Sequence, residues 1–430
     1  MVNLKEKFEE ARKLEATNVD QAIAAFTEII NTQEKPSDKL RIDEIIKLRE
    51  NSIYRVGQLY VNAQQAENIA ALLRSVRSLF AGFPKAKTAK IVKTLLDYTS
   101  KVPNTINLQI GLCEEFVEWC RQEKRTFLRQ RIETKLAMLY AQQEQFTKAI
   151  EFIERLLREV KKLDDKGLLV EIHLIESKVY FALLNFPKSK AALTAARTNA
   201  NSIYCPPILQ AEIDLMSGIL NAQEKDYKTG YSYFYESFEA FDTSSDARAV
   251  TSLKYMLLAK IMNNQSRDIN GILAGKTALK YTGNQIDSIT SVADAHKKRS
   301  LLDFQKALDT YENELKKDDV IKNHLDELYD NMLEQNLIRI VEPYSKVELT
   351  YVAQKISLEL TTVQAKLSEM ILDKKILGTL DQGNDCLILF EEEDDSEINL
   401  YNEALKTMGN IDNVVNSLGE KVRKIKIQSQ

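Results

Sequence analysis

The sequence predicts a mostly α-helical protein in which stacked helical hairpins are followed by two short helices, a β-hairpin and a long C-terminal helix. Two observations carry the first part of this prediction. The 430 residues include only 13 glycines and 7 prolines, well below average usages of about 7% and 5%. A short motif also recurs at nearly constant spacing, which is typical of repeat proteins.

The repeated motif is an apolar position, a second marker residue six or seven positions on, and a small residue three positions later. Its clearest copy is Leu139-Tyr140, Phe146 and Ala149, and later copies follow after 40, 41 and 41 residues. We expect the apolar pair to close the first helix, the aromatic residue to open the second, and the small residue to let the two backbones approach. The other copies are Val179-Tyr180, Phe186, Ser189; Leu220, Tyr227, Gly230; Ile261-Met262, Asp268, Gly271; and, two periods upstream of the first, Leu59-Tyr60, Ala66, Ile69.

One such hairpin cannot bury its apolar face alone, so neighbouring hairpins must stack. The sequence therefore predicts a solenoid of TPR-like helical hairpins. Residues 301–316 and 321–336 are predicted as two further amphipathic helices. They end before Glu342-Pro343-Tyr344, because proline disfavours helix in the residue that precedes it.

The next segment predicts a compact module of two helices and a hairpin. One helix has the apolar face Leu349, Val352, Ala353 and Ile356; the second has Val363, Leu367, Met370 and Ile371, preceded by Thr361 and Gln364 at capping-box spacing. Residues 376–380 and 386–390 flank a glycine-containing turn and predict a β-hairpin. Helix, helix and hairpin in this order are typical of a winged helix.

The tail begins with an acidic run, Glu391–Glu397, which predicts a solvated linker. The apolar residues beyond it have helical spacing, with an interruption near Gly409-Asn410. This seam is too long for a capping helix and predicts packing in a bundle with partner helices. It comprises Tyr401, Leu405, Met408, Val415, Leu418, Val422 and Ile425.

The sequence predicts no catalytic, metal or cofactor site. His173, His296 and His324 show no metal-ligand spacing, and no known catalytic motif is present. Gly271–Thr277 resembles a phosphate-binding loop, but three residues rather than four separate its glycines and no strand is predicted before it. The cysteines form no CxxC pair and are expected to be reduced thiols; they are Cys113, Cys120, Cys205 and Cys386.

Charge is spread unevenly along the chain. Residues 1–135 carry 23 basic and 18 acidic side chains, so the remainder carries 36 and 45. The basic residues between Glu67 and Glu114 have two open interpretations, an ordinary solvated helix face or a docking patch for an acidic protein surface. A second cluster, 121–131, is the weaker candidate. The candidate partner-binding residues are Arg74, Arg77, Lys85, Lys87, Lys90 and Lys93.

A winged helix also raises the hypothesis of DNA binding, because its second helix can enter a major groove. Residues 343–390 contain five lysines, no arginine and six acidic residues. On the second helix, Lys366 is opposed by Glu369 and Asp373. Since phosphate neutralisation supplies most duplex affinity, we expect a protein-contact module and no nucleic-acid partner. The sequence contains no run of about 20 apolar residues, so no membrane span is predicted.

Hairpin array, winged helix and C-terminal helix together resemble the PCI family of scaffold subunits, which occurs in the proteasome lid, the COP9 signalosome and translation initiation factor three. Several long segments are most similar to a lid component. They are 121–131, 156–167, 191–207, 254–263, 298–308 and 370–383.

The resemblance implies a non-catalytic scaffold that clamps the proteasome lid to the core particle and the ATPase ring, in cytoplasm and nucleus, without a cofactor. The N-terminal solenoid would contact the core-particle α-ring and the ATPase ring, and other PCI subunits would contact the winged helix and the C-terminal helix. A signalosome PCI subunit and a nucleic-acid-binding protein remain alternatives. The implied domains are a solenoid (1–220), a PCI domain (221–391, with helical repeats at 221–340 and a winged helix at 341–391), and a linker with the bundle helix (392–430).

Overall fold

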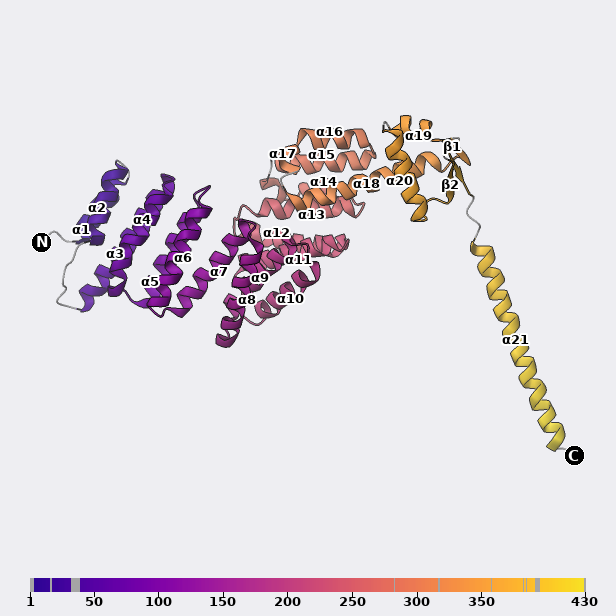
Figure 1. Cartoon of the computed structure of the whole chain (residues 1–430), viewed down its shortest axis with the longest axis horizontal. Helices are drawn as coiled ribbons and strands as arrows, with labels where there is room; N and C mark the ends of the chain where they lie inside the picture. Colours follow the sequence, from indigo (N-terminus) through magenta and orange to yellow (C-terminus); the bar gives the residue numbers. More distant parts are fainter. Residues whose placement is uncertain are drawn as a thin grey trace. The chain divides into compact units, whose positions relative to one another are not determined.

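The computed structural model describes residues 4–15, 18–31, 39–281, 283–315, 318–356, 358–381, 383, 385–390 and 395–428. It divides into two compact units, Met1–Ser252 and Leu253–Gln430. Helices dominate both units, and the strands of the described residues lie in the second (Figure 1). The predicted all-α solenoid, winged-helix module with a β-hairpin and long C-terminal helix are confirmed.

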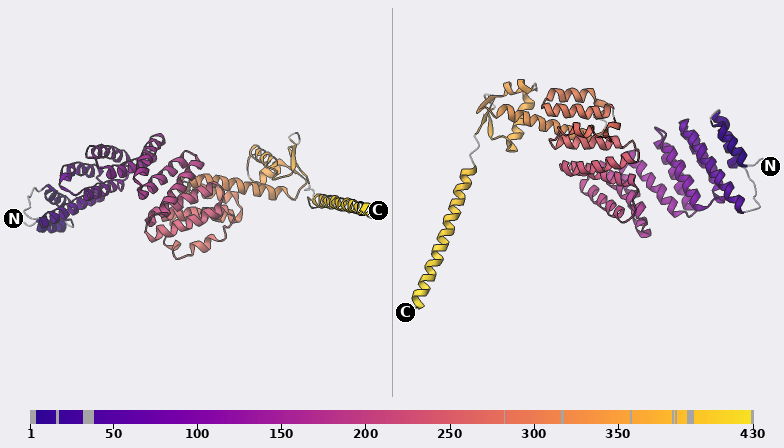
Figure 2. Two further views of the ribbon diagram at one scale, coloured as in Figure 1. Left: turned by 90° about the horizontal axis from the view of Figure 1, so that it is seen from below. Right: turned by 180° about the vertical axis from the view of Figure 1, so that it is seen from behind.

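The first unit is a series of helices, each packed against its neighbours in sequence (Figures 1 and 2). One continuous hydrophobic cluster runs through it from Ala11 to Val179. The helices are α1 Leu4–Leu14, α2 Val19–Asn31, α3 Lys39–Asn62, α4 Ala66–Val76, the 3-10 helix η1 Arg77–Gly82, α5 Lys85–Ser100, α6 Ile106–Gln122, α7 Thr126–Gln142, α8 Phe146–Leu163, α9 Lys166–Ala182, α10 Phe186–Asn201, α11 Pro207–Gln223 and α12 Tyr227–Thr243.

The repeated motif takes the predicted roles in this unit. The aromatic residues Phe146, Phe186 and Tyr227 are the first residues of α8, α10 and α12. A Cβ atom added at Gly230 would lie 3.3 Å from the carbonyl oxygen of Gly218, so the small residue does mark a close approach of α11 and α12. The weaker fourth copy fails, because Gly271 is exposed and a Cβ there would meet nothing within 4 Å.

One turn geometry, the Schellman motif, recurs at the ends of α3, α6, α7, α9, α11 and α12. After α7, the N–H of Gln145 donates to the carbonyl oxygen of Tyr140 at 3.0 Å, and the N–H of Glu144 donates to that of Ala141 at 3.2 Å. Glu144 has a φ of 62°, as this motif requires. A helix of 17 or 18 residues and a turn of two or three fill 20 positions from Thr126 to Gln145, from Phe146 to Asp165 and from Lys166 to Asn185. The geometry of helix and turn thus explains the period of about 40. The same pair of bonds recurs with Gln64, Lys124, Leu184, Lys225, Ser245 and Asn264 in the left-handed position.

α12 is rich in tyrosine and phenylalanine, but only some of these aromatic side chains are buried. Phe234, Phe238 and Phe241 are buried. Tyr233 is half-buried and its hydroxyl accepts a hydrogen bond from Arg197 at 2.8 Å, whereas Tyr235 is 49% exposed. The phenylalanines therefore form the core face of α12, and the tyrosines form its border with solvent.

The second unit continues with helices and ends in the winged helix and the C-terminal helix. The segment predicted as one helix over 301–316 is broken at Tyr311, and the helix predicted over 321–336 is longer than expected. The elements are α13 Ala249–Met262, which begins in the first unit, α14 Ile269–Leu273, η2 Ala278–Lys280, α15 Asn284–Lys298, α16 Leu301–Thr310, α17 Glu312–Leu315, α18 Asp319–Val341, β1 Lys346–Glu348, α19 Leu349–Ile356, α20 Leu360–Leu372, β2 Gly378–Asp381, β3 Cys386–Leu389 and α21 Asp395–Gln428.

The winged helix contains the predicted hairpin and one strand that the sequence analysis missed. β3 lies between β1 and β2 and is antiparallel to both. β1 has three residues, too few for an alternating pattern to stand out. The predicted capping box is wrong: Glu359 precedes α20 and makes no side-chain cap, and Thr361 lies inside the helix.

Leu184 offers a test of the shared turn. It has a φ of 58° and is 71% exposed, so its side chain adds strain and little burial. Because glycine adopts this conformation without a steric penalty, Leu184→Gly is expected to raise the free energy of unfolding by about 0.5–1 kcal/mol. Leu183→Gly, at a φ of −81°, is the matched control and should lower it. Urea unfolding of the full chain measures both; a destabilised Leu184→Gly variant would contradict the expectation.

Candidate interaction surfaces

The described residues show no arrangement suited to metal binding. They contain no group of three or more His, Cys, Asp or Glu side chains placed to hold an ion. Each histidine has its own local partner: His173 bonds Glu176 at 2.8 Å, His296 lies 3.4 Å from Ser266, and His324 lies 3.9 Å from Glu327.

The segment that resembles a phosphate-binding loop lacks the required geometry. Gly271 lies inside α14, whereas a P-loop needs a strand that turns into a helix. The cysteines are free thiols. Burial raises the pKa of Cys113 to about 12 and that of Cys120 to about 11, so neither forms an appreciable thiolate at neutral pH.

The two arginines of the predicted basic patch serve internal contacts. Arg74 forms a forked pair with Glu115 of α6, with its Nε and Nη2 atoms at 3.0 and 2.7 Å from the carboxylate oxygens. The guanidinium of Arg77 lies 5.8 Å from the centre of the Trp119 ring. Trp119 is buried against Phe80 and Phe116. Both arginines are exposed, but their charges already have partners.

Among the residues of this patch, three of the four lysines of α5 remain available to contact a partner protein. Lys87 is half-buried and lies 3.5 Å from Glu50 of α3. Lys85, Lys90 and Lys93 are exposed, and within the described ranges their amino groups make no hydrogen bond or ion pair. Lys93 acts on the carboxylate of Glu171 only at longer range. The structure thus narrows the basic surface to three residues of one helix.

Two arginines of the second basic cluster, Arg121 and Arg129, are committed to internal ion pairs. The carboxylate of Glu133 is 2% exposed, and Arg121, Arg129 and Arg155 lie within 3.4, 3.8 and 3.4 Å of it. These residues come from α6, α7 and α8. Arg129 also pairs with Glu159. Because removing one partner of a buried ion pair leaves an uncompensated charge, this network holds three helices together and is poorly suited to exchange its partners for a docking protein.

On the winged helix, Lys366 of α20 is enclosed by carboxylates. Its Nζ atom lies 2.9 Å from Glu369, 3.3 Å from Glu334 and 4.0 Å from Asp330, and its side chain is 13% exposed. Glu334 of α18 also accepts a hydrogen bond from Lys375 at 2.6 Å. This cation is therefore neutralised within the chain and unsuited to phosphate contact.

The three-stranded sheet has β1 and β2 as its edge strands, since β3 is paired on both sides. A Cβ atom at Gly378 would lie 2.5 Å from the carbonyl oxygen of Ile388, so glycine is needed for the close pairing of β2 with β3. Leu377 and Phe390, which flank this edge, are 45% and 56% exposed. The edge suits an added strand or an apolar neighbour.

The C-terminal helix α21 exposes the whole seam as far as its side chains are described. Tyr401, Leu405 and Met408 are 66–67% exposed, and Val415 and Leu418 are 58% and 55% exposed. The helix runs unbroken through Gly409, and Ile411 fills the interruption predicted near Gly409-Asn410, so the spacing from Met408 to Leu418 is three, four and three. Asp395 to Glu397, predicted as linker, belong to α21. Glu391–Asp394 and the side chains of Val422 and Ile425 lie outside the described residues.

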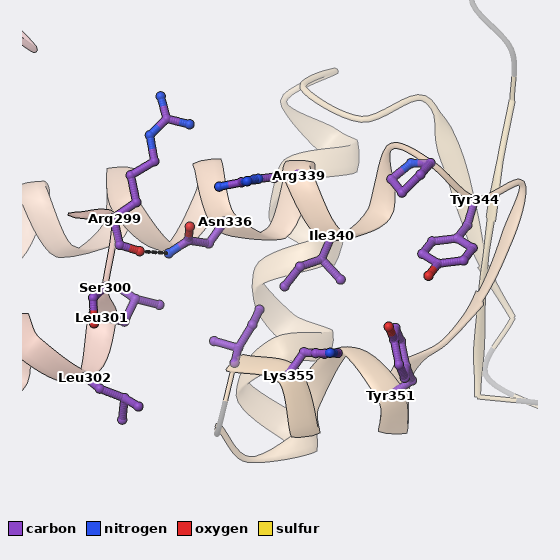
Figure 3. A pocket seen from close by; sticks show the side chains of 12 residues that line it. Arg299, Ser300, Leu301, Leu302, Asn336, Arg339, Ile340, Tyr344, Tyr351 and Lys355 are labelled. Carbon is purple, nitrogen blue, oxygen red and sulfur yellow. Dashed lines mark hydrogen bonds between the residues drawn. The ribbon is translucent and has the colours of Figure 1, made fainter. Parts of the chain in front are cut away.

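A basic groove was not predicted from the sequence. It has a volume of about 490 Å³ and opens between the turn before α16, the last turns of α18, and α19 (Figure 3). Arg299, Arg339 and Lys355 line it together with Tyr344 and Tyr351. These residues are far apart in the sequence and share no periodic pattern, so only the fold brings them together.

Comparisons with known proteins agree with this architecture. The model of the 26S proteasome regulatory subunit RPN6 N-terminal domain matches residues 4–143, and that of the PCI domain matches residues 308–391. The 26S proteasome non-ATPase regulatory subunit 11 homolog of Arabidopsis thaliana is 50% identical over 405 residues, which are 94% of this chain and 95% of the relative. The 26S proteasome non-ATPase regulatory subunit 11 of Dictyostelium discoideum is 46% identical over 99% of this chain and 100% of the relative.

This chain belongs to the family of 26S proteasome non-ATPase regulatory subunit 11, or RPN6. RPN6 of Saccharomyces cerevisiae is 42% identical over 96% of this chain and 98% of the relative. Through the PCI match, the winged helix built from β1, α19, α20, β2 and β3 is the end of a PCI domain. Within the described ranges, none of the RPN6-family helices here combines the length and apolarity that crossing a membrane requires.

Glu334 makes the ion pairs of the PCI domain testable by pH. Partial burial raises its pKa, but the hydrogen bonds from Lys375 and Lys366 outweigh this and hold the pKa below the ordinary value of 4.5. A lowered folded-state pKa contributes stability above the unfolded value, and this contribution is lost as the pH falls through the folded pKa. Glu334→Gln is therefore expected to destabilise the fold by about 1 kcal/mol at neutral pH, and the difference from wild type should shrink below pH 4.5.

Thermal unfolding between about pH 7 and about pH 3 measures this difference. Asp326→Asn on the same helix removes an exposed carboxylate for which the described structure records no ion pair, and it serves as the matched control. A penalty in Glu334→Gln that stays constant with pH would rule out the ion pairs as its source.

Proposed function

We propose that this chain is a non-catalytic scaffold of the 26S proteasome lid, which clamps the lid to the core particle and the ATPase ring for assembly and ubiquitin-dependent degradation. The observation that carries the proposal is the apolar seam of α21. Five seam residues with described side chains are more than half exposed, and a long exposed apolar face indicates a surface that partners cover. Family membership supports the proteasome as the assembly.

The separate surfaces suggest separate partners. We assign the α21 seam, extended by Ile411, to a helix bundle with other PCI subunits, and the β2 edge of the winged helix to a neighbouring PCI domain. The lysines of α5 would face acidic surfaces of the core-particle α-ring or the ATPase ring. The enclosure of Lys366 argues against duplex nucleic acid as a partner, and the proteasome names of the relatives favour the lid over the signalosome.

The domain division remains part of the proposal. We assign residues 1–220 to the N-terminal solenoid, 221–391 to the PCI domain and 392–430 to the linker and bundle helix. Residence in cytoplasm and nucleus follows from the proposed assembly.

The seam can be tested by substituting its apolar side chains. Leu405→Asp combined with Val415→Asp places two carboxylates where apolar contact is proposed, and incorporation into the lid is expected to fall at least tenfold because burying an unpaired charge is costly. Native gels of a reconstituted lid measure incorporation. Asn410→Asp with Asn413→Asp adds the same charge to the opposite face of α21 and should assemble normally. Unchanged incorporation of the seam variant, or of a chain lacking 398–430, would refute the bundle role.

The α5 surface can be tested by charge reversal. Lys85, Lys90 and Lys93 changed to Glu are expected to weaken association of the lid-containing complex with the core particle about tenfold at physiological salt, mainly through slower association. Lys87 is left in place because it pairs with Glu50. Reversal of Lys161, Lys162 and Lys228, which are also exposed and lie outside both basic clusters, gives a control of equal charge. The docking role fails if both triple variants behave alike in binding measured over a salt series.

A further inference from the structure

The groove on the second unit has a composition that sets it apart from the other surfaces. Arg299 lies in the turn before α16, Arg339 in the last turns of α18 and Lys355 in α19. Figure 3 shows Arg339 and Lys355 on opposite walls, Arg299 toward one end and the two tyrosines toward the other. The groove therefore presents cations along its length, from three separate segments.

These cations lack carboxylate partners within the described part of the chain. Arg299, Arg339 and Lys355 are exposed, none is in a recorded ion pair, and no acidic residue lines the groove. Lys355 contacts the ring of Tyr351, with its Nζ atom 5.8 Å from the ring centre. In the same unit Lys366 and Lys375 both pair with Glu334. The lack of carboxylate partners is therefore specific to the groove and not shared by all cations of this unit.

The remaining lining is apolar and aromatic. Tyr344 and Tyr351 pack edge to face, with ring centres 6.3 Å apart and planes at 79°. Their hydroxyls face each other (Figure 3), and the rings are 44% and 40% exposed. Ile340 points into the space between the walls (Figure 3). A ligand that fits must combine negative charges with apolar groups.

We propose that this groove binds an acidic peptide segment of a partner protein. Its carboxylates pair with Arg299, Arg339 and Lys355, and its apolar side chains pack against Ile340 and the tyrosine rings. An arginine fork matches a carboxylate well, and exposed aromatic rings beside arginine are typical of protein-recognition sites. The site goes beyond the proposed scaffold function, because it involves neither the α21 seam nor the α5 lysines.

Two features favour a peptide over a nucleic acid. The rings of Tyr344 and Tyr351 contact one another edge to face, whereas single-stranded nucleic acid needs open ring faces on which successive bases stack. Three cations are also few for a polyphosphate backbone. The groove is open and its cations come from separate segments, which suits an extended chain with spaced charges better than a single phosphate.

The test uses the full chain and a short fluorescein-labelled peptide in which Glu alternates with Leu, measured by fluorescence anisotropy at physiological salt. Arg339→Glu combined with Lys355→Glu is expected to weaken binding at least tenfold. Lys322→Glu with Lys306→Glu makes the same charge change on exposed positions of α18 and α16 and should change affinity less than twofold. If the reversed variant does not fold by circular dichroism, Arg339→Gln with Lys355→Gln replaces it, with a smaller loss expected.

Other results would overturn the proposal. They are absence of binding to the wild-type chain, equal loss in groove and control variants, equal affinity for a peptide with Gln in place of Glu, and tighter binding of a single-stranded oligonucleotide of the same net charge. A lid-assembly defect in the seam variant with normal peptide binding would support both functions independently. Loss of peptide binding in a groove variant that still assembles would do the same.

Discussion

The structure depends on one constraint: a hairpin of amphipathic helices cannot bury its apolar face by itself. Each hairpin must lie against the next, and the result in the first unit is a hydrophobic cluster that continues from α1 to α9. Where it occurs, the Schellman turn keeps this stacking regular, because it ends those helices with the same geometry and satisfies their last carbonyl groups. In Leu184 and Glu144 the turn uses non-glycine residues in a left-handed conformation, so the packing of the helices outweighs local strain.

Charged residues divide into two groups according to where the helices meet. At helix junctions they are paired and partly buried, as Glu133 is with arginines of three helices and Glu334 is with Lys366 and Lys375. Away from junctions, Lys85, Lys90 and Lys93 of α5 and the cations of the groove have no carboxylate partner among the described residues. Clusters that look equally basic in the sequence thus differ in whether their charges are already paired within the chain. Only the unpaired cations can bind a partner protein at a small desolvation cost.

The sequence was sufficient for features that repeat or follow one period. The helix boundaries around Tyr140 and Phe146, the apolar faces of α19 and α20 and the hairpin strands were all predicted, because local spacing determines them. It was insufficient where distant residues decide. The sequence did not show that the fold places Glu115 beside Arg74. It also did not show that no neighbouring backbone approaches Gly271, although this residue matches the repeat. The short strand β1 forms only because β3 lies next to it. The groove cations belong to the same class, since residues 299, 339 and 355 meet only in three dimensions.

The C-terminal helix follows from the same constraint that stacks the hairpins. A helix in water gains most of its stability from burying an apolar face, yet the described seam of α21 is exposed along its length. Within the described residues no neighbouring helix covers that face, and in the proposed bundle other chains take the place of the next hairpin. In this proposal, assembly with other subunits buries the apolar face of α21, as stacking of neighbouring hairpins buries the apolar faces of α1 to α12. An exposed apolar seam of regular spacing is therefore what the packing constraint predicts for a helix whose neighbours belong to other subunits.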